Sequence, residues 1–107
     1  MYLLNAFSLN MVNTFPVKVR FQLIQLEDVQ EYLDDSLQSA VGHADTAAVF
    51  SALLGMEVPC ERRNVSLRPT DCAVLGQYTG PRLPEGATTL PEGAVIRWYL
   101  VSVERCL

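Results

Sequence analysis

The stretch AVIRWYLVSVE at residues 94–104 constrains the fold more than any other, because most of its residues are β-branched or aromatic. Such side chains fit the pleated surface of a sheet, so we expect one long strand here. Shorter stretches of the same kind predict four more strands, at 2–7, 17–26, 62–69 and 72–79. The clearest is 17–26, where apolar and polar residues alternate with the period of two that a strand requires.

Two stretches between these strands have a helical pattern. HADTAAVFSALLG at 43–55 contains five apolar residues and ends on Gly55, which predicts a helix with a glycine cap. The apolar residues are Ala47, Phe50, Ala52, Leu53 and Leu54. EDVQEYLDDSLQSAV at 27–41 has Val29, Leu33 and Leu37 four residues apart, which predicts a helix or helical turn ending before Gly42. The order of elements indicates one α/β domain over residues 1–107, with a mixed sheet of about five strands flanked by helices.

The segment GPRLPEGATTLPEG at 80–93 is rich in proline and glycine and repeats the tetrapeptide L-P-E-G. It is too long and too rich in turn residues for a tight hairpin. We expect a long surface loop before the last strand, able to cover a site as a lid.

Composition limits the partners. The formal net charge is −4 and lysines and arginines form no run, which disfavours broad binding to DNA or other long nucleic acid. Seven of the eight basic residues are arginines, which suits bidentate contacts to a small anion. The three cysteines and the single histidine show no metal-ligand spacing, so neither a metal nor another cofactor is expected.

The first fifteen residues lack a basic leader, and Asn5, Ser8, Asn10 and Asn13 interrupt their apolar positions. This pattern fits neither a signal peptide nor a membrane span. The unpaired cysteine pattern fits a reducing compartment. We therefore expect a cytoplasmic protein without a membrane partner.

His43 is the only histidine, and it lies where the helix at 43–55 should begin. The first-turn N–H groups of a helix attract anions, Gly42 permits a close approach, and a nearby phosphate would favour the imidazolium form of a general acid. The alternative is that Asp45 or Thr46 caps the helix while His43 points into water.

Two further motifs carry polar groups suited to a nucleotide. In NAFSLN, Asn5, Ser8 and Asn10 surround a strand end, where they could bind ribose, base or phosphate, or simply cap the turn. In RLPEG, Arg82 could hold a phosphate and Glu85 could orient a hydroxyl, or the two could form an ordinary exposed ion pair.

Taken together, YLLNAFSLNM, SAVGHADT and RLPEG resemble the small viral and prokaryotic ring nucleases of the type III anti-CRISPR family, over nearly the whole chain. The resemblance implies a metal-independent nuclease that cuts cyclic tetra-adenylate into linear di-adenylates with 2′,3′-cyclic phosphates, and so switches off type III CRISPR signalling. His43 would be the general acid, with Arg82 and Glu85 completing the catalytic set. Asn5, Ser8, Asn10 and Gly42 would bind the ligand.

The same resemblance implies a homodimer, in which two copies of His43 cut opposite linkages of the ring. If the protein is viral, it would act in the host cytoplasm. Two other functions stay open from the sequence: a non-catalytic binder that sequesters or senses cyclic oligoadenylate, and a small protein-interaction module.

Overall fold

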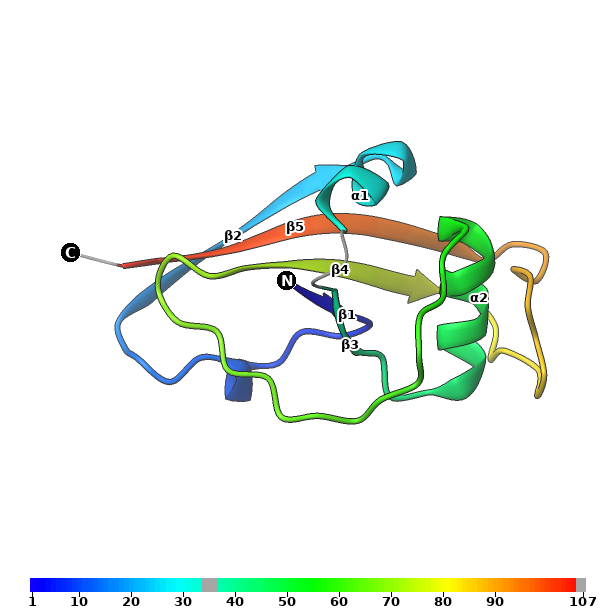
Figure 1. The fold of residues 1–107 in the computed structure, drawn as a ribbon, viewed down its shortest axis with the longest axis horizontal. Coiled ribbons are helices and arrows are strands. Elements are labelled where there is room, and N and C mark those ends of the chain that lie inside the picture. Colours follow the sequence, from blue (N-terminus) through cyan, green and yellow to red (C-terminus); the bar gives the residue numbers. More distant parts are fainter. Residues whose placement is uncertain (34–36, 106–107) are drawn as a thin grey trace.

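A computed structural model describes residues 1–33 and 37–105. Its centre is a five-stranded sheet in the order β2-β5-β4-β1-β3 (Figure 1). In chain order the elements are β1 (Tyr2–Leu4), the 3-10 helix η1 (Leu9–Met11), β2 (Val17–Ile24), α1 (Leu26–Tyr32), β3 (Gln38–Ala40), α2 (Ala44–Leu54), β4 (Cys72–Thr79) and β5 (Val95–Arg105). The expected α/β domain with a mixed five-stranded sheet is confirmed.

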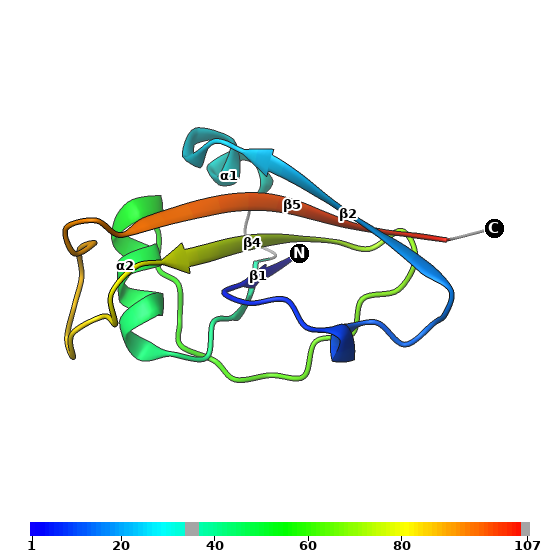
Figure 2. The ribbon, with the colours of Figure 1, turned by 180° about the vertical axis from the view of Figure 1, so that it is seen from behind.

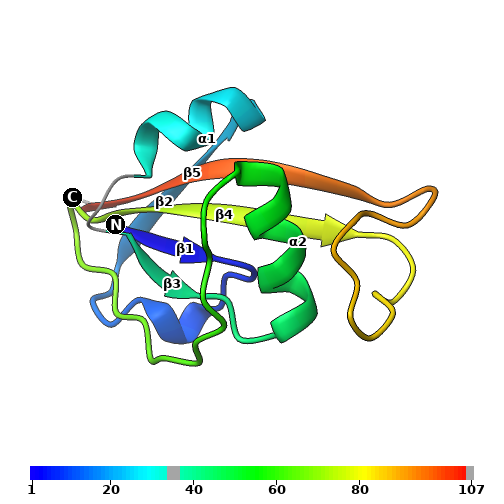
Figure 3. The same cartoon turned by 45° about the vertical axis from the view of Figure 1, so that its right-hand side comes forward.

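The sheet has a parallel half and an antiparallel half. β1 lies between β3 and β4 and is parallel to both, with Leu4 opposite Ala40 on one side and Leu75 on the other. β5 is antiparallel to β4 and to the edge strand β2. As a result β1, β3 and β4 all end at the same edge of the sheet, which lies next to α2 in Figure 3.

Both α-helices pack on one face of the sheet, as the view from behind makes clear (Figure 2). There Phe50 of α2 packs against Trp98 of β5, with ring centroids 4.9 Å apart. A Cβ built on Gly76 would come within 2.6 Å of both rings, so this position has room only for glycine. Val29 of α1 and Leu3 of β1, both fully buried, complete the layer.

No α-helix covers the opposite face within the described residues. Val12 and Leu67, from two loops that meet in an isolated parallel bridge, bury its centre. The two loops do not extend over β2, whose apolar side chains stay exposed on this face. Phe21 makes an edge-to-face contact with Phe7 but stays 48% exposed, and Leu23 is 62% exposed. We call this surface the helix-free face.

One predicted element is wrong, and a second is right only in its first part. Residues 62–69, expected as a strand, lie in an irregular segment whose β-bridge, at Leu67, pairs with Val12 of another loop and not with a strand of the sheet. The predicted helix at 27–41 ends at Tyr32, and Gln38–Ala40 forms strand β3 instead. The part of that prediction on residues 34–36 lies outside the described residues. Pairing with β1 overrides the four-residue spacing of apolar side chains.

The other predictions are confirmed within a few residues. α2 ends at Gly55, whose φ of 67° is the left-handed conformation expected of a glycine cap. The predicted strand at 72–79 is β4, and the long final strand is β5. Between them residues 80–94 form the expected loop at the α2 end of the sheet (Figure 1). Within the described residues, no helix has the length and apolar character needed to cross a membrane.

Candidate functional site

The candidate site lies where the three parallel strands end. In α/β sheets, ligands bind in the crevice outside the carboxyl ends of parallel strands. Asn5 directly follows β1, Gly42 lies between β3 and α2, and Arg82 follows β4. The topology therefore gathers residues from three distant parts of the chain at one edge.

His43 is the N-cap residue of α2, with φ −116° and ψ 129°. Its backbone carbonyl accepts the first helical hydrogen bond, from the Ala47 amide at 2.9 Å. Its side chain makes no cap hydrogen bond and is exposed. The cap expected in the alternative, from Asp45 or Thr46, is therefore wrong, whereas the exposed His43 side chain agrees with its second part. The imidazole stays available beside the first-turn N–H groups, which carry partial positive charge.

The loop after β4 brings Arg82 to His43. A hollow of about 290 Å³, which we call the histidine hollow, is open to solvent. It is lined by His43, Asp45, Thr46, Tyr78, Arg82 and Leu83. Glu85 follows three residues after Arg82 and lines an adjoining hollow together with Arg82 and Asp45. The predicted catalytic set of His43, Arg82 and Glu85 thus surrounds two neighbouring hollows.

A third hollow, which we call the Arg62 hollow, begins on the other side of His43. It has a volume of about 320 Å³ and is lined by Asn5, Ala6, Ala40, Gly42, His43, Arg62 and Arg63. Arg62 donates a hydrogen bond from Nε to the Gly42 carbonyl at 3.2 Å. His43 is the residue that the two hollows share, so a ligand with several phosphates could occupy both.

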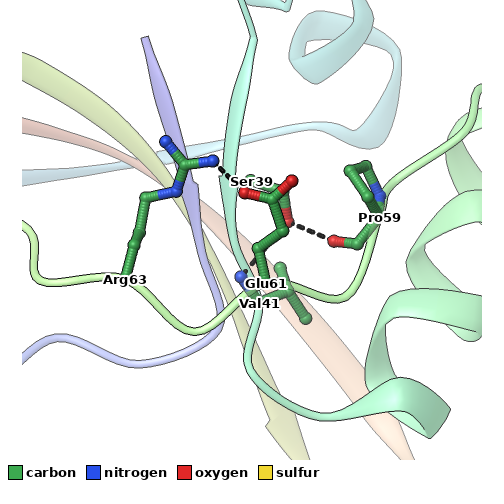
Figure 4. Close-up of polar contacts among 5 residues, drawn as sticks. All are labelled: Ser39, Val41, Pro59, Glu61 and Arg63. Atoms are coloured by element: carbon green, nitrogen blue, oxygen red, sulfur yellow. Dashed lines mark hydrogen bonds and ion pairs between the residues drawn. The ribbon is translucent and has the colours of Figure 1, made fainter.

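The segment that carries the two arginines is fastened to the strand before α2 (Figure 4). The Ser39 hydroxyl donates to the Pro59 carbonyl at 2.6 Å and accepts from the Val41 amide at 3.2 Å. The Glu61 amide donates to the Val41 carbonyl at 2.9 Å, and the Glu61 carboxylate pairs with Arg63 (Figure 4). Because Ser39 is buried, these bonds hold the segment firmly beside β3.

The structure separates two predicted ligand residues from this cluster. Ser8 precedes η1 and Asn10 lies within it; both are exposed, and neither lines the histidine hollow or the Arg62 hollow. Asn5 and Gly42 do line the Arg62 hollow. Of the N-terminal motif, Asn5 therefore lies in the site, whereas Ser8 and Asn10 lie outside it at η1.

Sequence reasoning missed three residues of the site, namely Tyr78, Arg62 and Arg63. Tyr78 belongs to β4, where it looks like an ordinary strand residue. The arginine pair was assigned to a strand, and its place opposite Gly42, twenty residues away, depends on tertiary packing. The adjacent pair of arginines was the one signal in the sequence that could have drawn attention to it.

The site holds both cationic and acidic side chains. Arg63 is paired with Glu61, whereas Arg62 and Arg82 have no carboxylate partner among the described residues. Asp45 and Glu85 bring negative charge to the loop side. Among the residues that the structure describes, no three His, Cys, Asp or Glu side chains are grouped as ligands for a metal ion. The arrangement suits a small polyanion with hydroxyl groups.

These features define a small α/β protein with a histidine and three arginines at the carboxyl ends of parallel strands. The chain belongs to the STIV B116-like family, whose model matches residues 1–97. Among solved structures it is similar to B116 of Sulfolobus turreted icosahedral virus, at 29% sequence identity and a TM-score of 0.80. That match covers 94% of this chain and 97% of B116. A comparison with curated proteins gives no match.

Proposed function

We propose that the protein is a metal-independent ring nuclease that opens cyclic tetra-adenylate. The observation that carries the proposal is that His43, at the positive end of α2, lies between two hollows that each contain an arginine without a carboxylate partner in the described part of the chain. The motifs that resemble ring nucleases include His43 and Arg82 of this cluster. Arg62, which those motifs do not include, adds a cation on the far side of His43.

The charges suit neighbouring phosphodiesters. A phosphate beside His43 would be within the influence of the first-turn N–H groups of α2 and of the Arg82 guanidinium. The next phosphate along the ring would meet Arg62, whose terminal Nη groups have no partner among the described residues. Asn5, at the end of β1, offers an amide to a ribose or a base. Because Arg62 and Arg82 each lie where a phosphate would bind, these two cations are enough for a chain of net charge −4 to bind the ring.

The chemistry requires orientation and one proton. The ribose 2′-oxygen attacks its own 3′-phosphorus while its hydroxyl proton passes to solvent water, a 2′,3′-cyclic phosphate forms, and the bond to the 5′-oxygen of the next nucleotide breaks. His43 would donate a proton to that leaving oxygen, and Arg82 would stabilise the charge that develops on the phosphoryl oxygens. Glu85 would orient the Arg82 guanidinium or the attacking hydroxyl. A positioned acid contributes about 10²–10⁴-fold to such a rate, so no metal is needed in this scheme.

The proposal includes a homodimer. One chain supplies one histidine, whereas two cuts on opposite sides of a fourfold ring need two, and a twofold dimer provides them. The exposed apolar side chains of Phe21 and Leu23 on the helix-free face support association, because their burial would be favourable. Sedimentation velocity should give twice the mass of one chain; a single-chain mass with bound ligand would contradict this part of the proposal.

Incubation of the wild-type protein with labelled cyclic tetra-adenylate tests the activity. We expect linear di-adenylate carrying a 2′,3′-cyclic phosphate, in equal yield with and without EDTA. Recovery of intact ring that stays bound to the protein would instead identify a non-catalytic binder. Cleavage that stops in EDTA would contradict the metal-independent scheme.

A further inference from the structure

A contact between α2 and the loop after β4 gives Asp45 a role that the proposed reaction does not assign. The Gly86 amide donates a hydrogen bond to Asp45 Oδ1 at 3.0 Å, joining residues 41 positions apart. Gly86 has a φ of 79°, a backbone conformation that favours glycine. Asp45 therefore anchors the loop at the residue that directly follows Glu85.

The same loop segment is anchored at its other end. The Tyr78 hydroxyl donates a hydrogen bond to the Pro81 carbonyl, just before Arg82. Residues 81–86 are thus tied at one end to β4 and at the other to the first turn of α2. Between the two ties, Arg82 and Glu85 have no hydrogen bond or ion pair among the described residues. The position of these two side chains relative to His43 therefore depends on the ends of the segment.

We propose that Asp45 is a positioning residue, whose carboxylate holds the Gly86 amide and thereby fixes Arg82 and Glu85 beside His43. This inference rests on the proposed function for its effect on cleavage, but the contact itself does not. The hydrogen bond also occupies an oxygen of a carboxylate that lines both loop-side hollows. The Asp45 carboxylate thus has the Gly86 amide as its partner. It is not bonded to Arg82, which stays available for phosphate.

A purely electrostatic role for Asp45 predicts something different. An acidic residue in the first turn stabilises a helix through its charge, and asparagine and alanine would both remove that charge. Asparagine keeps an oxygen at the same place and still accepts from Gly86, whereas alanine does not. Asp45→Asn and Asp45→Ala therefore separate the acceptor from the charge.

The test compares these two variants with Glu92→Gln. Glu92 is an exposed residue of the same loop and has in the second L-P-E-G the place that Glu85 has in the first. We expect Asp45→Ala to lower kcat for cyclic tetra-adenylate about three- to tenfold, the usual effect of one lost hydrogen bond. Glu92→Gln should stay within twofold of wild type, and Asp45→Asn should keep a clearly higher kcat than Asp45→Ala. Should Asp45→Ala fail to fold, Asp45→Ser replaces it, because the serine oxygen cannot reach as far.

Hydrogen exchange of the Gly86 amide, measured without ligand, gives a readout that does not depend on cleavage. It should accelerate in Asp45→Ala and not in Asp45→Asn. Equal losses of kcat in the two Asp45 variants, or unchanged exchange in Asp45→Ala, would overturn the proposal. If the wild-type protein leaves the ring intact, the proposed function and the catalytic part of this inference both fail, while exchange still decides whether Asp45 anchors the loop.

Discussion

Arg62 donates a hydrogen bond from Nε to the carbonyl of Gly42, 3.2 Å away, and so lies against the residue that precedes the only histidine. The contact unites the segment after α2 with the start of α2. It also explains the glycine, because a Cβ at position 42 would come within 3.1 Å of Arg62 Cγ. The binding side of the site therefore depends on the contact of Gly42 with Arg62, a residue that lies outside the three sequence motifs.

Removal of the Arg62 guanidinium should weaken the ligand complex. We expect Arg62→Ala to raise the Kd for cyclic tetra-adenylate about tenfold or more, as for other charge-assisted hydrogen bonds. Isothermal titration with the His43→Ala variant as background avoids turnover. Arg68→Ala is the matched control, because Arg68 is an exposed arginine that lines a separate hollow with Arg105. Equal losses in both variants would indicate a general charge effect.

A methyl group at Gly42 should act through Arg62. Gly42→Ala should displace the Arg62 side chain and raise the Kd severalfold without unfolding the protein, because the contacting atom belongs to a flexible side chain. The double variant Gly42→Ala with Arg62→Ala should bind no worse than Arg62→Ala alone. Additive losses in this double-mutant cycle would place the two effects in separate contacts.

Ser39 should matter for stability and for the position of the arginine segment. Ser39→Ala leaves the Pro59 carbonyl and the Val41 amide without their side-chain partner, and we expect unfolding to become easier by about 1–3 kcal/mol. Urea denaturation measures this change. Ser66→Ala is the control, because its hydroxyl serves only an exposed bond from Asn13, and it should shift the free energy of unfolding much less.

Gly76 should tolerate no side chain. In Gly76→Ala the new methyl group would meet the Phe50 and Trp98 rings at 2.6 Å, which should cost about 1–3 kcal/mol of stability. Gln77→Ala, on the exposed neighbouring residue of β4, should leave the free energy of unfolding nearly unchanged. A Gly76→Ala variant as stable as wild type would contradict the tight packing of α2 on the sheet.

The fold was predictable wherever a local pattern agreed with tertiary packing. α2 combines a high content of apolar residues with a glycine cap, and β5 combines β-branched and aromatic residues, so both could be located from sequence. β3 could not, because its three residues form a strand only through pairing with β1. The segment at 62–69 has strand-like residues that instead close the helix-free face as a loop.

The site was predictable where residues adjoin in the chain. His43, Arg82 and Glu85 stood out through motif and loop composition. Arg62, Tyr78 and the anchoring role of Asp45 did not, because each depends on a contact across at least one secondary-structure element. Asn10 shows the converse: a polar residue inside a recognisable motif can lie away from the hollows that the rest of the motif lines.

The most direct test is product analysis of cyclic tetra-adenylate after incubation with wild-type protein and with His43→Ala. We predict linear di-adenylate with a 2′,3′-cyclic phosphate from the wild type, and intact ring still bound by His43→Ala with little change in Kd. Cleavage by His43→Ala at the wild-type rate would contradict the role given to the imidazole.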